Sequence, residues 1–161
     1  MGVGKTAACE KLLNILQPGV FLDGDWCWNM RPFTVNTETK EMVLANIAFL
    51  LNGFLKCSVY EYIIFCWVMH EEKILSDVLS GLDTAEAQVF KFTLTANNEA
   101  LSKRILKDVA AGLRESGALE RSLERVALYG KMDTVKIDVN AAGPEKAARL
   151  IADYVNRRQK K

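Results

Sequence analysis

The first residues with recognisable chemistry form the run Gly2-Val3-Gly4-Lys5-Thr6, which an amphipathic segment follows directly. This run matches the second half of the phosphate-binding motif Gly-x-x-x-x-Gly-Lys-Thr. Glycines let such a loop curl until its N–H groups point at phosphate oxygens, and a following helix adds partial positive charge. Lys5 can reach the β and γ phosphates, and the Thr6 hydroxyl can ligate Mg²⁺.

We therefore predict a nucleoside triphosphate site for ATP with Mg²⁺. A five-residue match can also arise by chance in a loop. The order of the next segments favours the site, because a helical segment, a Pro18-Gly19 stop, a short strand and an acidic pair succeed one another along the chain. The residues predicted to hold the nucleotide are Gly2, Val3, Gly4, Lys5, Thr6 and Ala7.

Two carboxylates form the second candidate, Asp23 and Asp25, which Gly24 separates at the end of a short apolar segment. Residues two apart on a strand face the same way, so these side chains can share work at one site. The alternative is an acidic turn at a strand end, since Asp and Gly are common turn residues.

Aromatic and basic residues come directly after this pair: Trp26, Trp28 and Arg31. Tryptophans on a polar loop can stack on a base or sugar, and an arginine can clamp an anionic acceptor. The rings can equally roof the core, because tryptophan is mostly buried. The sequence leaves these two interpretations open.

Helical and strand signals alternate along the chain, which is typical of a mostly parallel sheet covered by helices on both faces. The run Tyr62 to Met69 is continuously apolar, as in a strand buried on both faces. We expect strands at 20–23, 62–69, 88–95 and 134–139, and helices at 6–16, from Asn36 or Thr37, at 72–79, from Asn97 or Asn98 to about 112, at 116–128 and from Pro144.

Composition indicates one folded domain over residues 1–161, half of them hydrophobic, a quarter charged, with a net charge of +1. Nothing in this balance points to nucleic acid as a partner, and the basic C-terminal tail is typical of a solvated end. Apolar runs are far shorter than the roughly 20 residues of a membrane span. Four cysteines without a Cys-x-x-Cys pair favour reduced, buried thiols and a cytoplasmic protein.

Gly4-Lys5-Thr6 followed by Phe21-Leu22-Asp23-Gly24-Asp25 resembles the P-loop kinases of small molecules. That family includes shikimate, gluconate, adenylylsulfate and nucleoside monophosphate kinases and antibiotic phosphotransferases, and the chain is also similar to a bacterial group labelled simply as ATPases. The resemblance implies a three-layer αβα P-loop NTPase fold. It further implies that Asp25 is the base for the attacking hydroxyl and that Asp23 helps to hold Mg²⁺ through water.

The stretch from Phe90 to Lys107 looks like the family's fourth strand leading into an arginine-bearing lid, here about residues 104–130. Such arginines offset charge in the transition state. The lid candidates are Arg104, Arg114, Arg121 and Arg125. Where a second lid arginine commonly follows the first, this chain has Lys107 and Asp108, and single arginines at helical spacing are usually surface partners.

Two further positions are suggested by the same resemblance. His70 ends the 62–69 strand near the expected site, where a lone histidine is more often structural than a ligand. The segment Asn140 to Pro144 matches the loop that packs on adenine in relatives, and its small residues equally fit any tight strand-to-helix turn. The acidic residue usual on the 62–69 strand is missing.

The family's first loop glycine and the strand before it do not appear in the sequence. In the P-loop kinase fold that strand is central, so we expect the sheet to lack its first, central strand and the Tyr62 to Met69 strand to have an unpaired edge. We also expect Met1 to be an internal methionine, with about ten residues before it in the natural protein.

The leading functional hypothesis is an ATP-dependent kinase that phosphorylates a small-molecule acceptor. The alternatives are a nucleotide-binding regulator or weak ATPase without phosphotransfer, and an N-terminally truncated inactive form. The sequence names neither the acceptor nor the oligomeric state.

Overall fold

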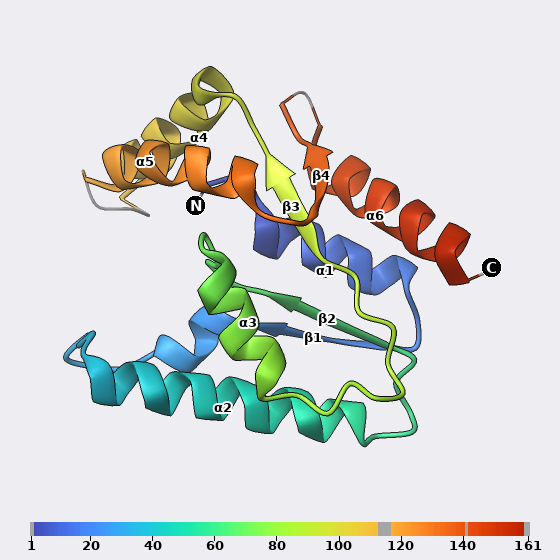
Figure 1. Cartoon of the computed structure of the whole chain (residues 1–161). Helices are drawn as coiled ribbons and strands as arrows, with labels where there is room; N and C mark the ends of the chain where they lie inside the picture. The colour runs from blue at the N-terminus through green and yellow to red at the C-terminus, as the bar shows by residue number, and fades with distance from the viewer. Residues whose placement is uncertain (1, 113–116, 141, 160–161) are drawn as a thin grey trace.

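Strands and helices alternate along the chain in the computed structural model, which describes residues 2–112, 117–140 and 142–159 (Figure 1). In order, the elements are α1 (Lys5–Ile15), β1 (Gly19–Asp23), the 3₁₀ helix η1 (Gly24–Trp28), α2 (Thr37–Leu55), β2 (Tyr62–Cys66), α3 (Glu72–Ser80), β3 (Phe92–Thr95), α4 (Asn98–Ala110), α5 (Ala118–Lys131), β4 (Val135–Asp138) and α6 (Pro144–Gln159). The helices and strands expected from the sequence are all present, with bounds that differ by a few residues.

Side-chain caps fix where two of the helices begin. The Asn36 carboxamide accepts the Thr39 N–H at 2.8 Å, and the Thr39 hydroxyl accepts the Asn36 N–H at 2.9 Å, so each residue satisfies an orphan donor of the other. Asn97 accepts the Ala100 N–H at 2.8 Å at the start of α4. Asn36 and Asn97 are thus confirmed as caps.

All four strands pair in parallel, in two separate two-stranded sheets. β1 pairs with β2 from Gly19 opposite Tyr62 to Asp23 opposite Cys66. β3 pairs with β4 from Phe92 opposite Val135 to Thr95 opposite Asp138. Among the described residues β2 pairs with β1 alone, and β3 with β4 alone.

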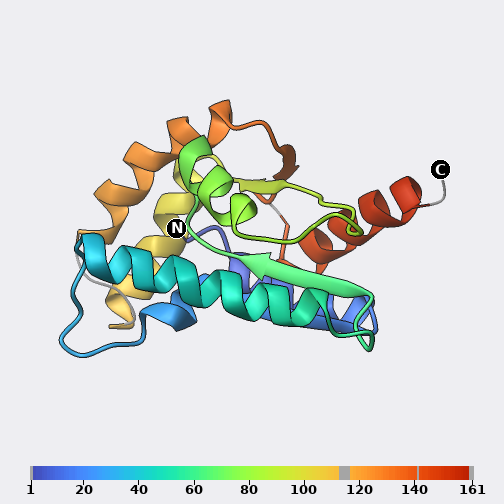
Figure 2. The same ribbon diagram turned by 60° about the horizontal axis from the view of Figure 1, so that its bottom comes forward.

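Helices cover both faces of the β1–β2 sheet, which makes three layers (Figures 1 and 2). On one face, Leu12 of α1 and Ile151 of α6 share a core with Ile64. On the other, Ile47 of α2 and Val78 of α3 pack on Leu22. A third, smaller cluster joins α4 to α5 through Leu101, Ile105 and Ala118.

Two strands are shorter than expected, and one is less buried. β2 ends at Cys66 rather than Met69, and β3 begins at Phe92 rather than Gln88. Only Ile64 and Cys66 of β2 are buried, so the expectation that this strand is buried on both faces is wrong. Within the described residues no strand lies beside the edge of β2 that faces away from β1. The other side chains of β2 are half-exposed.

All four cysteines are free thiols, but Cys66 is buried while Cys9, Cys27 and Cys57 are only half-buried. Hydrogen bonding with Cys9 is the largest cause, and burial the second, of a raised pKa of the Cys66 thiol. This thiol therefore stays protonated at neutral pH. No helix in the described part of the chain is long and apolar enough to cross a membrane.

Candidate functional site

The loop before α1 turns sharply at two glycines in the left-handed region. Gly2 and Gly4 both have positive φ, 82° and 85°. A Cβ on Gly4 would meet no atom within 4 Å, whereas one on Gly2 would lie 2.7 Å from Ile105 Cγ1. Gly2 therefore packs tightly on α4, while Gly4 leaves open space next to the helix.

No side chain caps α1, whose N-cap residue is Gly4. The first intrahelical bond runs from the Ala8 N–H to the Gly4 carbonyl at 3.0 Å. The N–H groups of Lys5, Thr6 and Ala7 thus precede the helical hydrogen-bond ladder and are available to an anion, which the positive end of the helix dipole also favours.

A short hydrogen bond ties this helix start to the acidic pair. The Thr6 hydroxyl donates to Asp23 Oδ2 at 2.6 Å, and the Asp25 N–H donates to Asp23 Oδ1 at 3.0 Å. Asp23 is 5% exposed. These two bonds give each oxygen of this buried carboxylate a partner, as buried polar atoms require. The structure thus brings Lys5, Thr6, Asp23 and Asp25 together at the carboxyl end of β1.

Thr6 and Asp23 have the ligand chemistry of Mg²⁺, which prefers hard oxygen donors and keeps several waters. No cluster of three or more carboxylate, imidazole or thiol side chains able to hold a metal occurs among the described residues. An ion here would take the Thr6 hydroxyl, Asp23 through water, and phosphate oxygens, which is a fit for Mg²⁺ carried in with a nucleotide.

Asp25 is more exposed than Asp23. It reaches solvent on one side, yet partial burial raises the pKa of its carboxyl above 3.8, and the negative charge of Asp23 raises it further. The Lys5 ammonium and a hydrogen bond from the Trp67 side chain lower this pKa in part. A carboxylate with a raised pKa is a better proton acceptor than an ordinary surface aspartate.

Trp67 also explains the residue between the two aspartates. A Cβ on Gly24 would lie 2.5 Å from Trp67 Cγ, so only glycine lets the indole pack against this turn. Sequence reasoning missed Trp67 because it stands about forty residues from the turn, at the end of the neighbouring strand, and no local spacing links the two.

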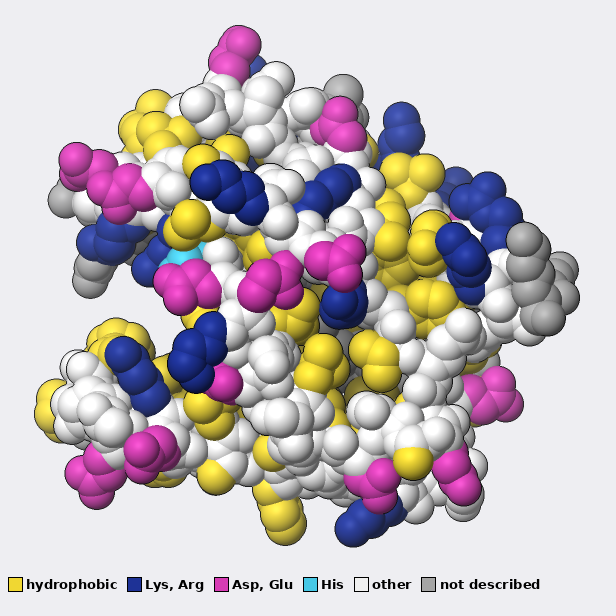
Figure 3. All heavy atoms as spheres, in the orientation of Figure 1, with side chains coloured by type: hydrophobic (Ala, Val, Ile, Leu, Met, Phe, Trp, Pro, Cys, Tyr) yellow, Lys and Arg dark blue, Asp and Glu magenta, His cyan; other side chains and the backbone are white. Residues whose placement is uncertain are grey.

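Three further side chains, His70, Arg125 and Tyr129, lie near one another close to Asp25, and we call them the His70 wall. The His70 and Tyr129 rings are 6.4 Å apart in an edge-to-face arrangement. His70 Nδ1 and the Tyr129 hydroxyl are buried and have no hydrogen-bond partner within the described residues. Burial and the nearby Arg125 charge lower the pKa of His70, opposed by Glu71. The histidine, cyan in Figure 3, borders a hollow on this face of the molecule.

Tyr129 connects this wall to the acidic pair. Burial raises the pKa of Tyr129 to about 12, Arg125 opposes the shift, and the charge of Asp25 adds to it. Asp25, Arg125 and Tyr129 therefore share one electrostatic neighbourhood. A half-buried tyrosine late in a helix of the expected lid carries no distinctive sequence signal, which is why the sequence did not single it out.

The two tryptophans after the acidic pair differ in environment. Trp28 packs against the cluster of Leu22, Val43 and Ile47 and lies 6.0 Å from the Phe33 ring. Trp26 is 56% exposed and contacts Phe21 edge-to-face at 5.3 Å. Trp28 thus takes the core-roofing place that the sequence left open, while Trp26 remains available at the surface.

The remaining candidate arginines are dispersed. Arg31 is exposed on the loop before α2. Arg104 donates through Nη2 to the Val139 carbonyl at 2.5 Å and to that of Asn140 at 3.3 Å, so α4 is tied to the end of β4. Arg121 is exposed on α5, and Arg114 lies outside the described residues.

A second hollow, of about 210 Å³, adjoins the loop. Gly2, Gly4, Arg104, Val139 and Pro144 are among its lining residues. The segment 142–144 after β4 thus stands beside the loop glycines, where the sequence resemblance expects adenine.

No protein-family model matches the chain, and no curated protein matches its sequence. Solved structures do match. The tunicamycin resistance protein of Deinococcus radiodurans superposes with a TM-score of 0.73 at 19% identity, over 96% of this chain and 90% of that one.

Two kinases superpose over nearly the whole chain as well. A sugar kinase from Janibacter gives a TM-score of 0.66 at 17% identity, over 96% of this chain and 89% of that one. A gluconokinase from Sinorhizobium meliloti gives 0.61 at 17% identity, over 98% and 92%. At 17–19% identity, it is the α/β fold with parallel strands that this chain shares with these three proteins.

Proposed function

We propose that this chain binds Mg-ATP at residues 2–7 and transfers the γ-phosphoryl group to a hydroxyl of a small-molecule acceptor. The observation that carries the proposal is the 2.6 Å bond between the Thr6 hydroxyl and Asp23, which sets a phosphate-cradle helix directly against two carboxylates. The likeness of the fold to those of a gluconokinase and a sugar kinase supports it.

Each residue of this group has a distinct task in the proposal. The N–H groups of Lys5 to Ala7 bind phosphate oxygens, and the Lys5 ammonium neutralises charge on the transferred group. Thr6 and, through water, Asp23 would hold Mg²⁺, which would supply positive charge to offset that of the phosphates. Asp25 accepts the proton of the acceptor hydroxyl. The oxygen of that hydroxyl bonds to the γ-phosphorus, and the bond between the γ-phosphorus and the ADP oxygen breaks.

We place the acceptor between Asp25 and the wall formed by His70, Arg125 and Tyr129. Two buried polar atoms of this wall have no partner among the described residues, which is costly unless a ligand or water satisfies them, and both stand close to one arginine. This combination suits a polyhydroxylated acceptor that carries an anionic group. Trp26 and Arg31 are the candidates for further acceptor contacts from the loop side.

Nucleotide binding without phosphotransfer is the second candidate function, and one observation favours it. Arg104, the first lid candidate, already donates to two backbone carbonyls, which tie it to the end of β4. A protein that lacked a mobile lid arginine would bind ATP tightly and turn it over slowly.

Calorimetry of Mg-ATP binding tests the common part of both functions, with Lys5→Ala as the variant and Lys11→Ala as the matched control. Lys11 lies on the same helix and pairs at the surface with Glu145. Binding that only Lys5→Ala abolishes supports the site, and binding that survives Lys5→Ala overturns it.

Phosphotransfer to a panel of sugar acids, sugars and nucleosides then separates the two functions. Transfer that Asp25→Asn removes, with Mg-ATP affinity kept, supports the kinase. Tight Mg-ATP binding without transfer to any acceptor supports the nucleotide-binding regulator.

A further inference from the structure

Helix α2 is apolar on two opposite sides. One side is buried, where Val43 and Ile47 pack on Leu22 of β1. On the opposite side a second set of residues recurs every three or four positions, and all of them are exposed: Met42, Ala45, Phe49 and Gly53. We call this side the outer face of α2. Figure 2 shows no helix or strand of the described chain in front of α2.

The outer face exposes large apolar side chains. Phe49 is 78% exposed and Met42 44% exposed. A surface helix places polar residues opposite its buried side, and a helix that is apolar all round is normally covered all round. In Figure 3 hydrophobic side chains protrude at the lower edge of the molecule, where α2 lies in Figure 1. The outer face therefore has the character of a surface that another protein covers.

Gly53 indicates that the covering partner approaches closely. Glycine in a helix interior destabilises the helix relative to alanine. The fold of the chain does not require glycine here, because a Cβ at Gly53 would meet no atom of the described residues within 4 Å. A small residue on one helix leaves room for a large side chain of another helix. The outer face has two large residues, Met42 and Phe49, and two small ones, Ala45 and Gly53.

The order of these residues along α2 is complementary to the same order reversed. In an antiparallel pair of α2 helices centred level with position 47, Phe49 of one copy faces Ala45 of the other, and Met42 faces Gly53. Each large residue then meets a small one. Both contacts occur twice, because a two-fold axis relates the copies.

Charges at the two ends of α2 favour the antiparallel pair over a parallel one. Glu38 in the first turn and Lys56 at the C-cap are exposed and lie on the same side of the helix as Phe49. No ion pair within the described chain uses either of them. An antiparallel pair sets each Glu38 beside the other copy's Lys56, whereas a parallel pair sets like charges together. Exposed Val35 and Val59, beyond the two ends, face each other in the same arrangement.

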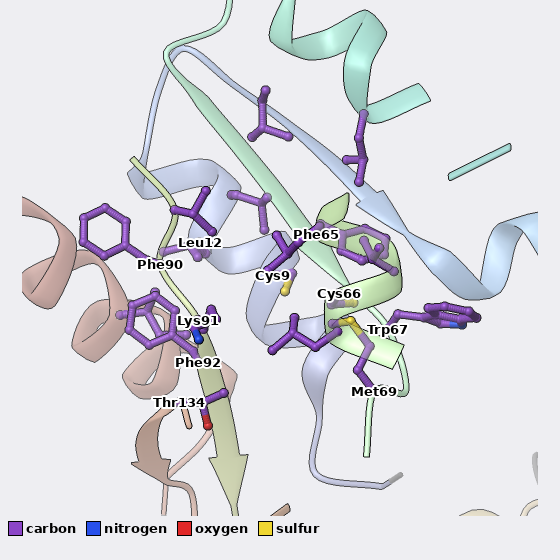
Figure 4. A pocket seen from close by; sticks show the side chains of 18 of the residues that line it. Cys9, Leu12, Phe65, Cys66, Trp67, Met69, Phe90, Lys91, Phe92 and Thr134 are labelled. Carbon is purple, nitrogen blue, oxygen red and sulfur yellow. The ribbon is translucent and has the colours of Figure 1, made fainter. Parts of the chain in front are cut away.

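The large apolar cavity of the molecule is a separate feature. It has a volume of about 1280 Å³, and Figure 4 shows Cys9 and Leu12 of α1 in it between Phe65 of β2 and Phe92 of β3. Among the described residues that line it, none belongs to the four of the outer face. A molecule that filled this cavity would leave the outer face as exposed as before.

We propose that the outer face of α2 binds the same face of a second copy of this chain, in an antiparallel two-fold pair. The apolar residues form its centre, and contacts between Glu38 and Lys56 form its two ends. Two helices with short flanking segments bury an area at the low end of stable interfaces, about 1,200 Å² in total, so the dimer dissociates in the micromolar range. This inference does not depend on the proposed function, and its test needs no nucleotide.

Sedimentation equilibrium of the full chain, from about 1 to about 200 µM, tests for the dimer. The average mass is expected to rise from that of one chain toward that of two. Phe49→Glu should raise the dissociation constant at least about tenfold, because it places a charge at the apolar centre. Leu106→Glu changes an exposed apolar residue of α4 and is the matched control, which should leave the constant unchanged. A chain that stays monomeric throughout, or two variants that dissociate alike, overturns the proposal.

Three further variants test the arrangement of the two helices. Gly53→Leu should weaken the dimer by a similar factor, while its urea midpoint at about 1 µM should not fall, because the monomer has room for the side chain. Glu38→Lys and Lys56→Glu should each weaken the dimer, and the double variant should restore most of the affinity. A Gly53→Leu dimer as tight as that of the parent, a double variant as weak as the single ones, or assembly beyond two copies contradicts the antiparallel pair.

Discussion

The Thr6 hydroxyl donates a 2.6 Å hydrogen bond to Asp23 Oδ2, so one threonine links the first turn of α1 to the end of β1. The contact joins the two parts of the site that lie seventeen residues apart in sequence. It gives Thr6 a structural role in the apo protein in addition to any role with Mg²⁺.

Replacing Thr6 with valine should destabilise the protein in the absence of any ligand. The substitution removes the donor to a carboxylate that is 5% exposed, and a buried acceptor without its partner costs about 1–3 kcal/mol of unfolding free energy. Urea unfolding measures this loss. Thr6→Ser keeps the hydroxyl and is the control, so equal stability of the valine and serine variants would refute the structural role.

Replacing Trp67 with phenylalanine should raise the pKa of Asp25. A hydrogen bond from the Trp67 side chain lowers this pKa, and phenylalanine keeps the ring contact with Gly24 without a donor. A carboxyl-carbon NMR titration of Asp25 reports the change directly. In a phosphotransfer assay the acid limb of kcat/KM, which needs ionised Asp25, should move to higher pH. An unchanged or lower pKa contradicts the assigned contact.

The elements were predictable where a local signal fixes them. Asn36 and Asn97 cap their helices through bonds to residues three positions on, so a short stretch of sequence contains the whole cause. The same holds for the loop glycines, whose positive φ is typical of the motif.

The site was predictable only in part, because its second half depends on long-range packing. Trp67 meets Gly24 across the β1–β2 sheet, and Tyr129 reaches the Asp25 neighbourhood from α5. Arg104 matched a lid pattern, yet the tertiary fold sets it against the carbonyls of Val139 and Asn140. Contacts of this kind depend on residues that are distant in the sequence, so local spacing cannot predict them.

Replacing Asp25 with asparagine should greatly slow phosphotransfer and stabilise the folded protein at pH 7. The raised pKa means that the folded state disfavours the carboxylate, so ionised Asp25 lowers stability above its unfolded pKa of about 3.8. This penalty is relieved as the pH falls through the folded pKa. Loss of a general base costs roughly 10²–10⁴-fold in rate.

Urea midpoints of the two proteins across pH check the stability part of this prediction. The variant should be the more stable at pH 7, and the difference should vanish in acid, where Asp25 is neutral in both states. A variant that is less stable at pH 7 would show that Asp25 makes favourable contacts as an anion and is not a poised base.

His70 is the single histidine of the chain, so its imidazole gives one signal to follow. It therefore provides a direct probe of the wall formed by His70, Arg125 and Tyr129, where we propose that the acceptor binds. Burial and the Arg125 charge hold the pKa of His70 below 6.5, so its ionisation opposes folding as the pH falls through that value. Arg125→Gln should raise this pKa by removing a neighbouring positive charge, and should reduce the loss of stability in mild acid. Arg149→Gln, an exposed site on α6, is the control and should leave the His70 titration unchanged.

Acceptor binding should move the same signal in a defined direction. An anionic group seated between Arg125 and His70 adds negative charge beside the imidazole and raises its pKa, whereas an uncharged acceptor cannot do so by charge. Titration of His70 by NMR with and without a sugar acid, and with the matching neutral sugar, distinguishes the two. A pKa that rises with the acid alone, and only while Arg125 is present, would locate the anionic group at this wall. A pKa that neither ligand moves would place the acceptor elsewhere, and Trp26 and Arg31 would then be the side chains to vary.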